Sequence, residues 1–373
     1  MYKILATEQG GFPEPRNSLK EYLLHANLVG EEPSRMTTAQ RVEELIALMV
    51  HFAKVDASQS PDAKSFSRLS LRTPRNVMLK FIESQLNDIS DSSDTEKRRS
   101  FLETLKASLL RDQEIHGLIC PTIEKVPELV GGSSSKDSCI YQAISPVYRD
   151  RPIKFSKIVK MALDDQGVIL FGISKGRHHI KCLICKEDDG LSIKVINTGE
   201  GNDDTFFNDL TADGLIIPKI FRVSSQDQDH FFRELSRKII ARSQSDYEAG
   251  MDPVKSLLKH YETSEDPEYS KNSHQEQNGG YCVTESLFAG MMELYTHLNP
   301  GSDQSEAWLL CSDLYKGLVD EIKDVIIIVL EEMTRKGELI DPVVYDLMEI
   351  STQSLTQSVK GLVGSRYKEL SRL

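Results

Sequence analysis

The residues with the clearest chemical potential lie in QEQNGGYCVTES (residues 275–286), where Cys282 follows two glycines and opens an apolar stretch with helical spacing. Backbone N–H groups at a helix start stabilise a thiolate, which makes a cysteine there a better nucleophile. Gln277, five residues earlier, carries an amide that can donate to an oxyanion together with the Cys282 N–H. The pattern predicts a nucleophilic cysteine, and a buried cysteine behind a loop is the ordinary alternative.

A nucleophilic cysteine needs a base, and GRHHIKCLIC (residues 176–185) offers His178 and His179 at the start of a β-like segment. Strand side chains alternate between faces, so only one of the two imidazoles can face a given site. Asn197, at the end of the next β-like segment, can accept from the imidazole N–H and fix its tautomer. Asp203 is a weaker substitute beyond the glycines. The alternatives without catalysis are that His178 and His179 are surface residues and that Asn197 belongs to an ordinary Asn-Thr-Gly turn.

The order His, Asn, Gln and Cys resembles the adenovirus-protease and SUMO-protease group of cysteine peptidases, a permuted relative of papain that shares its order with bacterial effector deubiquitinases and YopJ-type acetyltransferases. The resemblance rests on GRHH, INTGEG and QNGGYC and covers residues 165–298. It implies that His179 or His178 is the base, Asn197 orients it, Gln277 lines the oxyanion hole and Cys282 attacks.

Three features depart from that family pattern. Ile180 follows His179 where a tryptophan is common, and Tyr281-Cys282-Val283 replaces Asp-Cys-Gly. The family glutamine lies six or seven residues before the cysteine, whereas here Gln277 is five before and Gln275 is seven before. The oxyanion role therefore stays open between the two glutamines.

No cofactor or metal is expected. Cys182 and Cys185 have the spacing of a metal or redox motif, but residues three apart on a strand point to opposite faces, which is wrong for joint ligation. No Walker-type phosphate loop occurs in the sequence.

The segments around these residues predict an α+β fold, with a small antiparallel or mixed sheet between helical flanks. Helical spacing predicts helices near residues 38–54, with Thr38 as N-cap, and at 73–89, 101–110, 231–243, 253–261, 281–298, 314–336 and 342–363. Residues 90–100 read as a polar break and 117–137 as a linker. Four β-like segments lie at 167–174, 179–186, 191–198 and 215–223, and Glu187-Asp188-Asp189-Gly190 predicts a hairpin turn.

This organisation predicts an N-terminal helical region (residues 1–116), an α+β cysteine-hydrolase-like core (117–300) and a C-terminal helical region (301–373). The amphipathic helix at 312–337 is expected to be core, with a partner-binding groove as the functional alternative. A net charge of −12 argues against nucleic-acid binding. The longest strongly apolar stretch, residues 325–330, is far shorter than a membrane span of about 20 residues.

Six cysteines in 373 residues favour a soluble protein in a reducing compartment. The expected function is that of a cysteine-dependent hydrolase, a peptidase or deubiquitinase, acting on a protein substrate such as ubiquitin or a ubiquitin-like protein. Helical flanks around such a core resemble virulence effectors that bacteria deliver into the host cytosol. The alternatives are an acyltransferase, of the acetyltransferase or transglutaminase kind, that uses the same triad, and a non-catalytic module that binds host proteins.

Overall fold

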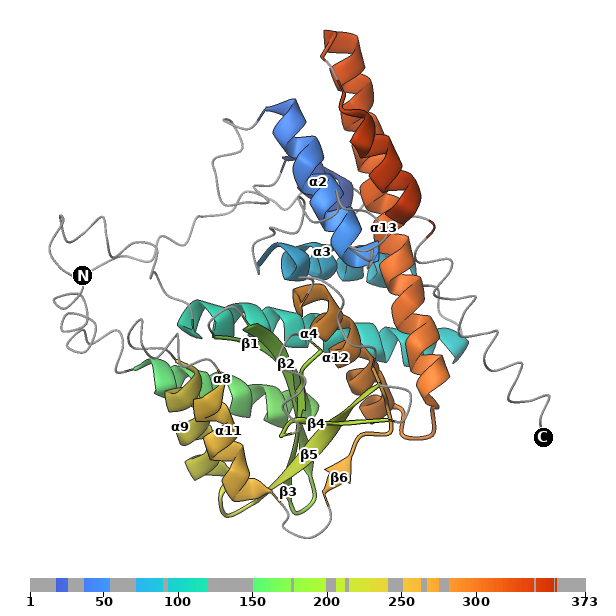
Figure 1. The fold of residues 1–373 in the computed structure, drawn as a ribbon. Helices are drawn as coiled ribbons and strands as arrows, with labels where there is room; N and C mark the ends of the chain where they lie inside the picture. Colours follow the sequence, from blue (N-terminus) through green and yellow to red (C-terminus); the bar gives the residue numbers. More distant parts are fainter. Residues whose placement is uncertain are drawn as a thin grey trace, which may run out of the picture.

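The computed structural model describes residues 18–25, 37–53, 72–89, 93–119, 150–175, 178–198, 206–211, 215–240, 251–262, 267–274, 282–338, 340–351 and 353. Its helices are α1 (Ser18–His25), α2 (Thr38–Ala53), α3 (Arg72–Asp88), α4 (Ser93–Ile119), α8 (Arg151–Gln166), α9 (Gln228–Ile239), α11 (Asp252–Leu258), η4 (Lys259–Tyr261), α12 (Cys282–Leu298) and α13 (Gln304–Lys336). A further helical segment covers residues 342–351. Figure 1 shows the strands gathered at one end of the molecule, while α2 and α13 run side by side away from them.

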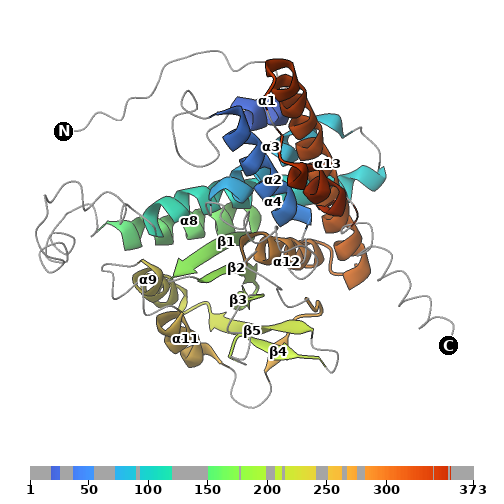
Figure 2. The same ribbon diagram turned by 45° about the horizontal axis from the view of Figure 1, so that its top comes forward.

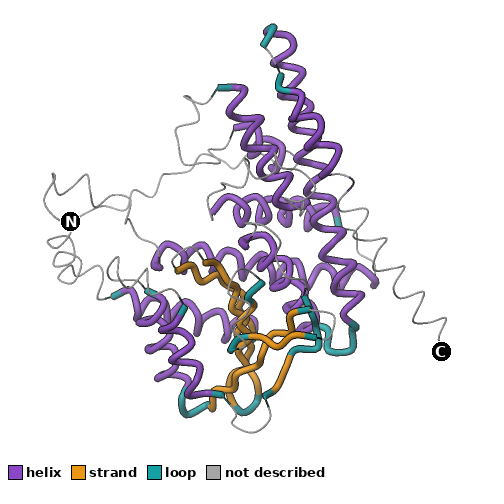
Figure 3. The backbone as a smooth tube through the Cα atoms, viewed as in Figure 1, coloured by secondary structure: helices purple, strands orange, loops and turns teal. Residues whose placement is uncertain are grey.

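The sheet has the four strands that the sequence predicts, and all its pairings are antiparallel. They are β1 (Val168–Lys175), β2 (His178–Glu187), β3 (Gly190–Ile196) and β5 (Ile216–Ser224), joined by two strands too short to predict, β4 (Asn208–Leu210) and β6 (Glu268–Tyr269). The order is β1-β2-β3-β5-β4, with β6 paired to β5. The fold class is therefore α+β, and Figure 3 shows the strands as a compact group among the helices.

The predicted hairpin turn is confirmed, because Glu187 pairs with Gly190 and Asp188-Asp189 form the loop between β2 and β3. Gly190 is needed for a second reason. A Cβ added there would lie 2.0 Å from the carbonyl oxygen of Val223 on β5. The glycine thus lets β5 pair closely beside β3.

The sheet separates two hydrophobic cores. The first core combines Leu170, Leu183, Cys185 and Ile196 from one face with α1, α2, α3, α4, α12 and α13. The second core combines Ile169, Phe171, Cys182 and Ile184 from the other face with α8, α9 and α11. Figure 2 shows α12 on one side of the sheet and α9 and α11 on the other. The first core joins elements from all three regions into which the sequence divides the chain.

The outer edge of β1 is closed by side chains of α4. The N–H groups of Leu170 and Gly172 point away from β2, and they donate to Ser108 Oγ at 3.3 Å and to Asp112 Oδ1 at 2.7 Å. Ser108 and Asp112 are one helical turn apart, so one face of α4 meets two alternate residues of the strand. A sheet edge left open would recruit other chains, and here α4 prevents it.

Three predicted helix boundaries are wrong. The N-cap of α2 is Thr37 instead of Thr38, because Thr37 Oγ1 accepts from the Gln40 N–H at 3.2 Å while Gln40 Oε1 accepts from the Thr37 N–H at 2.9 Å. The predicted polar break at residues 90–100 is already helical from Ser93, since its charged residues are good helix formers. Helix α13 begins at Gln304, ten residues before its predicted start, where Asp303 caps it by accepting from the Glu306 N–H.

Helix α8 lies in a part of the chain where no helix or strand is expected. Pro152 in its first turn and Gly167 after its last residue, at φ 71°, are the signals that mark it. The predicted linker at residues 117–137 lies outside the described residues from 120 onward. Within the described ranges, no helix combines the length and the apolar character needed to cross a bilayer.

Candidate functional site

The structure describes some of the predicted site residues and leaves others outside the described ranges. His179 and Asn197 are described in full, whereas only the backbone is described for His178 in β2 and for Cys282 as the first residue of α12. Gln275, Gln277 and Asp203 lie outside the described residues. The site is therefore built from the strands and the helix that carry the predicted base and nucleophile.

His179 is buried on the face of the sheet that meets α12. In the β1–β2 pairing, His179 lies opposite Ser174 of β1. Two residues later along β2, Lys181 lies opposite Gly172. A Cβ added to Gly172 would lie 2.6 Å from His179 Cε1 and 3.0 Å from its Nε2. The missing side chain at Gly172 is thus the space that the imidazole occupies.

Helix α12 runs along β2 with its N-terminus toward the start of the strand. A Cβ on Gly290 would contact Leu170 at 2.9 Å and Lys181 Cβ at 3.5 Å, so the helix crosses the sheet there. Three residues later Glu293 binds Lys194, which is opposite Leu183 on β2. The successive contacts move along β2 toward its C-terminal end as α12 proceeds toward its own.

The C-terminal end of α12 also lies near the C-terminal end of β2, so the N-terminal end of α12 must lie near the start of β2. His297 lines a cleft of about 280 Å³ together with Ser192 and Glu187, near the β2–β3 turn. Cys282 is eight residues before Gly290, about 12 Å in the opposite direction along the helix axis. His179 is two residues before Lys181, about 7 Å in that same direction along the strand. The first residue of α12 and His179 therefore share one end of one face of the sheet.

Asn197 follows the last residue of β3 and is buried. Its carbonyl oxygen accepts from Asn208 Nδ2 at 3.1 Å. The β2–β3 pairing ends with Lys181 opposite Ile196, and its continuation would set Thr198 opposite His179 and Asn197 opposite Ile180. Strand alternation would then direct Asn197 toward the second core and His179 toward α12. The orienting role of Asn197 stays a prediction.

Sequence reasoning missed an ion pair beside the predicted base. Lys181 Nζ donates to Asp112 Oδ2 at 3.0 Å, and the two side chains are 3% and 4% exposed. A Cβ added to Gly172 would lie 3.2 Å from Lys181 Nζ and 3.0 Å from His179 Nε2. The Lys181 and His179 nitrogens are therefore no more than about 6 Å apart. A lysine within the apolar strand, at a position that faces the core, is the signal that could have revealed it.

The charge of Asp112 is maintained despite its burial. Burial raises the pKa of this carboxyl, but the Lys181 ammonium, the Arg75 guanidinium and the Gly172 N–H outweigh that effect and hold the pKa below its ordinary value. Arg75 also donates to the Asp112 carbonyl oxygen at 3.4 Å. A fixed negative charge from α4 and a fixed positive charge from β2 thus lie next to the His179 imidazole.

A second buried polar cluster, also missed, holds the segment that leads toward Cys282. Glu293 is fully buried and accepts from Lys194 Nζ and Ser270 Oγ, each at 2.7 Å. Its Oε1 is 2.9 Å from His274 Nε2. Burial raises the pKa of Glu293, but Lys194 and His274 outweigh it and lower the pKa to about 2.

His274 is also fixed through its backbone, because it exchanges both main-chain hydrogen bonds with Ile216 at 2.7 and 2.8 Å. Asn272 donates to Thr296 Oγ1 at 3.1 Å and so ties the same segment to α12. Residues 270–274 are thereby anchored to both the sheet and the helix immediately before Gln275.

The described residues provide little for a metal. Within them, no group of three or more His, Cys, Asp or Glu side chains is arranged to hold an ion. Cys182 and Cys185 are buried in opposite cores, as the strand argument predicts. Burial raises the pKa of both thiols, that of Cys185 to about 12, which disfavours the thiolate that a metal would need.

The sequence was also compared with known proteins. No protein-family model matches this chain, and no curated protein matches its sequence.

Proposed function

We propose that this protein is a cysteine-dependent hydrolase, of the peptidase or deubiquitinase kind, in which Cys282 is the nucleophile and His179 the base. The observation that carries the proposal is the course of α12 along β2. It brings the helix start that bears Cys282 to the end of the sheet where His179 is buried over Gly172.

The chemistry follows from these two groups. The His179 imidazole takes the proton of the Cys282 thiol, and the thiolate attacks the carbonyl carbon of an amide or isopeptide bond. The carbon–nitrogen bond breaks as the imidazolium returns its proton to the leaving amine. Water then adds to the thioester, with the imidazole again as base, and the carboxylate product and the thiol are released.

Supporting groups complete this proposal. Gln277 or Gln275 supplies an oxyanion donor. Asn197 can orient His179 only where the backbone after Ile196, the last residue of β3, leaves strand alternation and turns the amide toward the imidazole. The tethering of residues 270–274 by Glu293 favours a fixed entry into the glutamine-bearing loop. The substrate is a protein, with ubiquitin or a ubiquitin-like protein as the first to test, and the organisation suits an effector acting in a host cell.

The test begins with per-residue alkylation of the native chain by iodoacetamide, read by mass spectrometry from pH 5 to 9. We expect Cys282 to react faster than Cys182, Cys185 and Cys311, which are buried. His179→Ala should slow Cys282 to the rate of an ordinary thiol. His178→Ala is the matched control and should leave the rate within about twofold, because neighbouring strand residues face opposite ways.

Turnover is measured with a fluorogenic ubiquitin C-terminal amide and with a ubiquitin-like counterpart. Cys282→Ala should abolish turnover, and His179→Ala should lower kcat/KM by a factor on the order of 10²–10⁴. If the protein instead transfers an acetyl group from acetyl-CoA and does not hydrolyse the ubiquitin probes, the proposed function would be acyltransferase instead of hydrolase. Alkylation of Cys282 at an ordinary rate, with no turnover of any probe, would favour a non-catalytic interaction module.

A further inference from the structure

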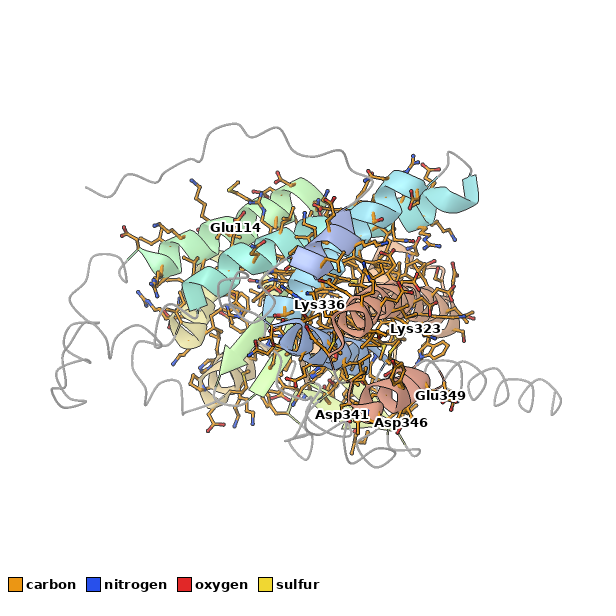
Figure 4. The ribbon with its side chains drawn as sticks, turned by 90° about the horizontal axis from the view of Figure 1, so that it is seen from above. Glu114, Lys323, Lys336, Asp341, Asp346 and Glu349 are labelled. Carbon is orange, nitrogen blue, oxygen red and sulfur yellow. The ribbon has the colours of Figure 1, made fainter. Side chains whose placement is uncertain are left out.

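A groove lies between α4, which covers the outer edge of β1, and α8, which packs in the second core. Its volume is about 440 Å³, and its floor is apolar: Leu118 from α4, with Ile158 and Met161 from α8. Its rim is charged, with Arg111 and Glu114 on α4 facing Lys154 and Lys157 on α8. Figure 4 labels Glu114 on α4, next to the neighbouring helix α8.

The two lysines of the rim have no acidic partner among the residues that the structure describes. Lys154 and Lys157 form no ion pair within the described part of the chain, although every other cation nearby has a partner. Arg111 pairs with Glu114 and Asp165, Lys160 pairs with Asp229, and Arg151 donates to the Leu118 carbonyl oxygen. Considering the described residues alone, two positive charges one helical turn apart therefore remain unpaired on a chain whose net charge is −12.

Exposed apolar side chains extend the groove. Ile153 is 69% exposed and Met161 is 41% exposed, and each is one helical turn from Lys157 on α8. Leu110, also 41% exposed, is one turn before Glu114 on α4. An apolar strip beside uncompensated charge is typical of a surface that binds a partner of opposite charge.

From this charge and shape we infer that the α4–α8 groove binds an acidic amphipathic helix of a partner protein. Its apolar side chains lie on Leu118, Ile158 and Met161, and carboxylates one turn apart pair with Lys154 and Lys157, which are themselves one turn apart. A protein segment fits better than an anionic membrane, because the site is concave.

The experiment uses the full chain and fluorescence anisotropy of a labelled helical peptide with leucines at positions i, i+3 and i+7 and glutamates beside them. We expect saturable binding that weakens as salt is raised. Lys154→Glu with Lys157→Glu should weaken binding by about tenfold or more, and Met161→Asp should do the same. Lys316→Glu, a lysine-to-glutamate change at one exposed position of α13, is the control and should leave binding unchanged.

Three results would overturn the inference. One is equal binding of a peptide with lysines in place of the glutamates. Another is binding of phosphatidylserine vesicles, but not of the acidic peptide, that is lost in the double lysine variant, since the occupant would then be a membrane. The third is peptide binding that appears only after residues 120–149 are replaced by a Gly-Ser linker, since that connection would then be the occupant.

Discussion

Asp112 of α4 and Lys181 of β2 are 69 residues apart in the chain and form a 3.0 Å ion pair buried at the edge of the sheet. The same carboxylate accepts from the Gly172 N–H of β1, so one side chain holds a helix, an edge strand and an inner strand together. The pair also lies beside His179, the proposed base.

Removal of one partner from this pair should be costly. Asp112→Ala leaves the Lys181 ammonium buried without its carboxylate and the Gly172 N–H without its acceptor, so we expect the free energy of unfolding to fall by about 3–5 kcal/mol. Urea denaturation measures it. Asp164→Ala, which removes an exposed ion pair with Lys186, is the control and should cost less than about 1 kcal/mol. Equal losses in the two variants would show that the buried pair contributes nothing special.

Gly172→Ala should displace the proposed base. The added methyl group would lie 2.6 Å from His179 Cε1, so the imidazole must move, and overpacking of this kind costs about 1–3 kcal/mol. Any turnover that depends on His179 should fall more than stability alone explains, which kcat/KM measured well below the melting temperature would reveal. Gly117→Ala on α4, where the new Cβ has no atom within 4 Å, is the matched control. Turnover that is unaffected by Gly172→Ala would argue against His179 as the base.

The Glu293 cluster should make stability sensitive to acid. The folded pKa of Glu293, about 2, is below the unfolded value of about 4.3, so its contribution is complete above the unfolded pKa and is lost as the pH falls toward 2. The contribution amounts to about 3 kcal/mol. Glu293→Gln should be less stable at neutral pH and should have a flatter pH dependence below pH 4. Chemical denaturation at several pH values measures both, and parallel pH profiles for the two proteins would contradict the assignment.

Thr37 and Thr38 provide a sharp test of the α2 cap. Thr37→Ala removes the hydroxyl that accepts from the Gln40 N–H, so the free energy of unfolding should fall by about 1 kcal/mol. Thr38→Ala leaves that hydrogen bond intact and should change it by less than half as much. The reverse order of effects in thermal denaturation would restore Thr38 as the cap.

The sequence predicts the elements that depend on local pattern. The β-branched segments become β1, β2, β3 and β5, and the Glu187–Gly190 turn becomes the hairpin between β2 and β3. Helix α8 also carries local signals, in Pro152 near its start and Gly167 after its end. The strands β4 and β6 have no signal of their own, because so few residues acquire a strand conformation only by pairing with β5.

The candidate site is less accessible to sequence reasoning. His179 and Asn197 stand out by residue type, but the face that each occupies depends on register and burial. Asp112, Lys181, Glu293 and His274 are single polar residues in ordinary helices, strands and loops, and their pairing arises only when distant segments pack together. A motif therefore suggests the reacting groups, whereas the charges that surround them follow from the tertiary structure.

The covering of β1 by α4 has a practical consequence for any attempt to isolate the catalytic region. A fragment that begins at residue 117 would keep β1 but lose Ser108 and Asp112, so the main-chain donors of Leu170 and Gly172 would face solvent. Bare strands of this kind join with one another across molecules. We therefore expect such a truncated form to precipitate or to accumulate as multimers, and useful expression boundaries to start upstream of Ser93.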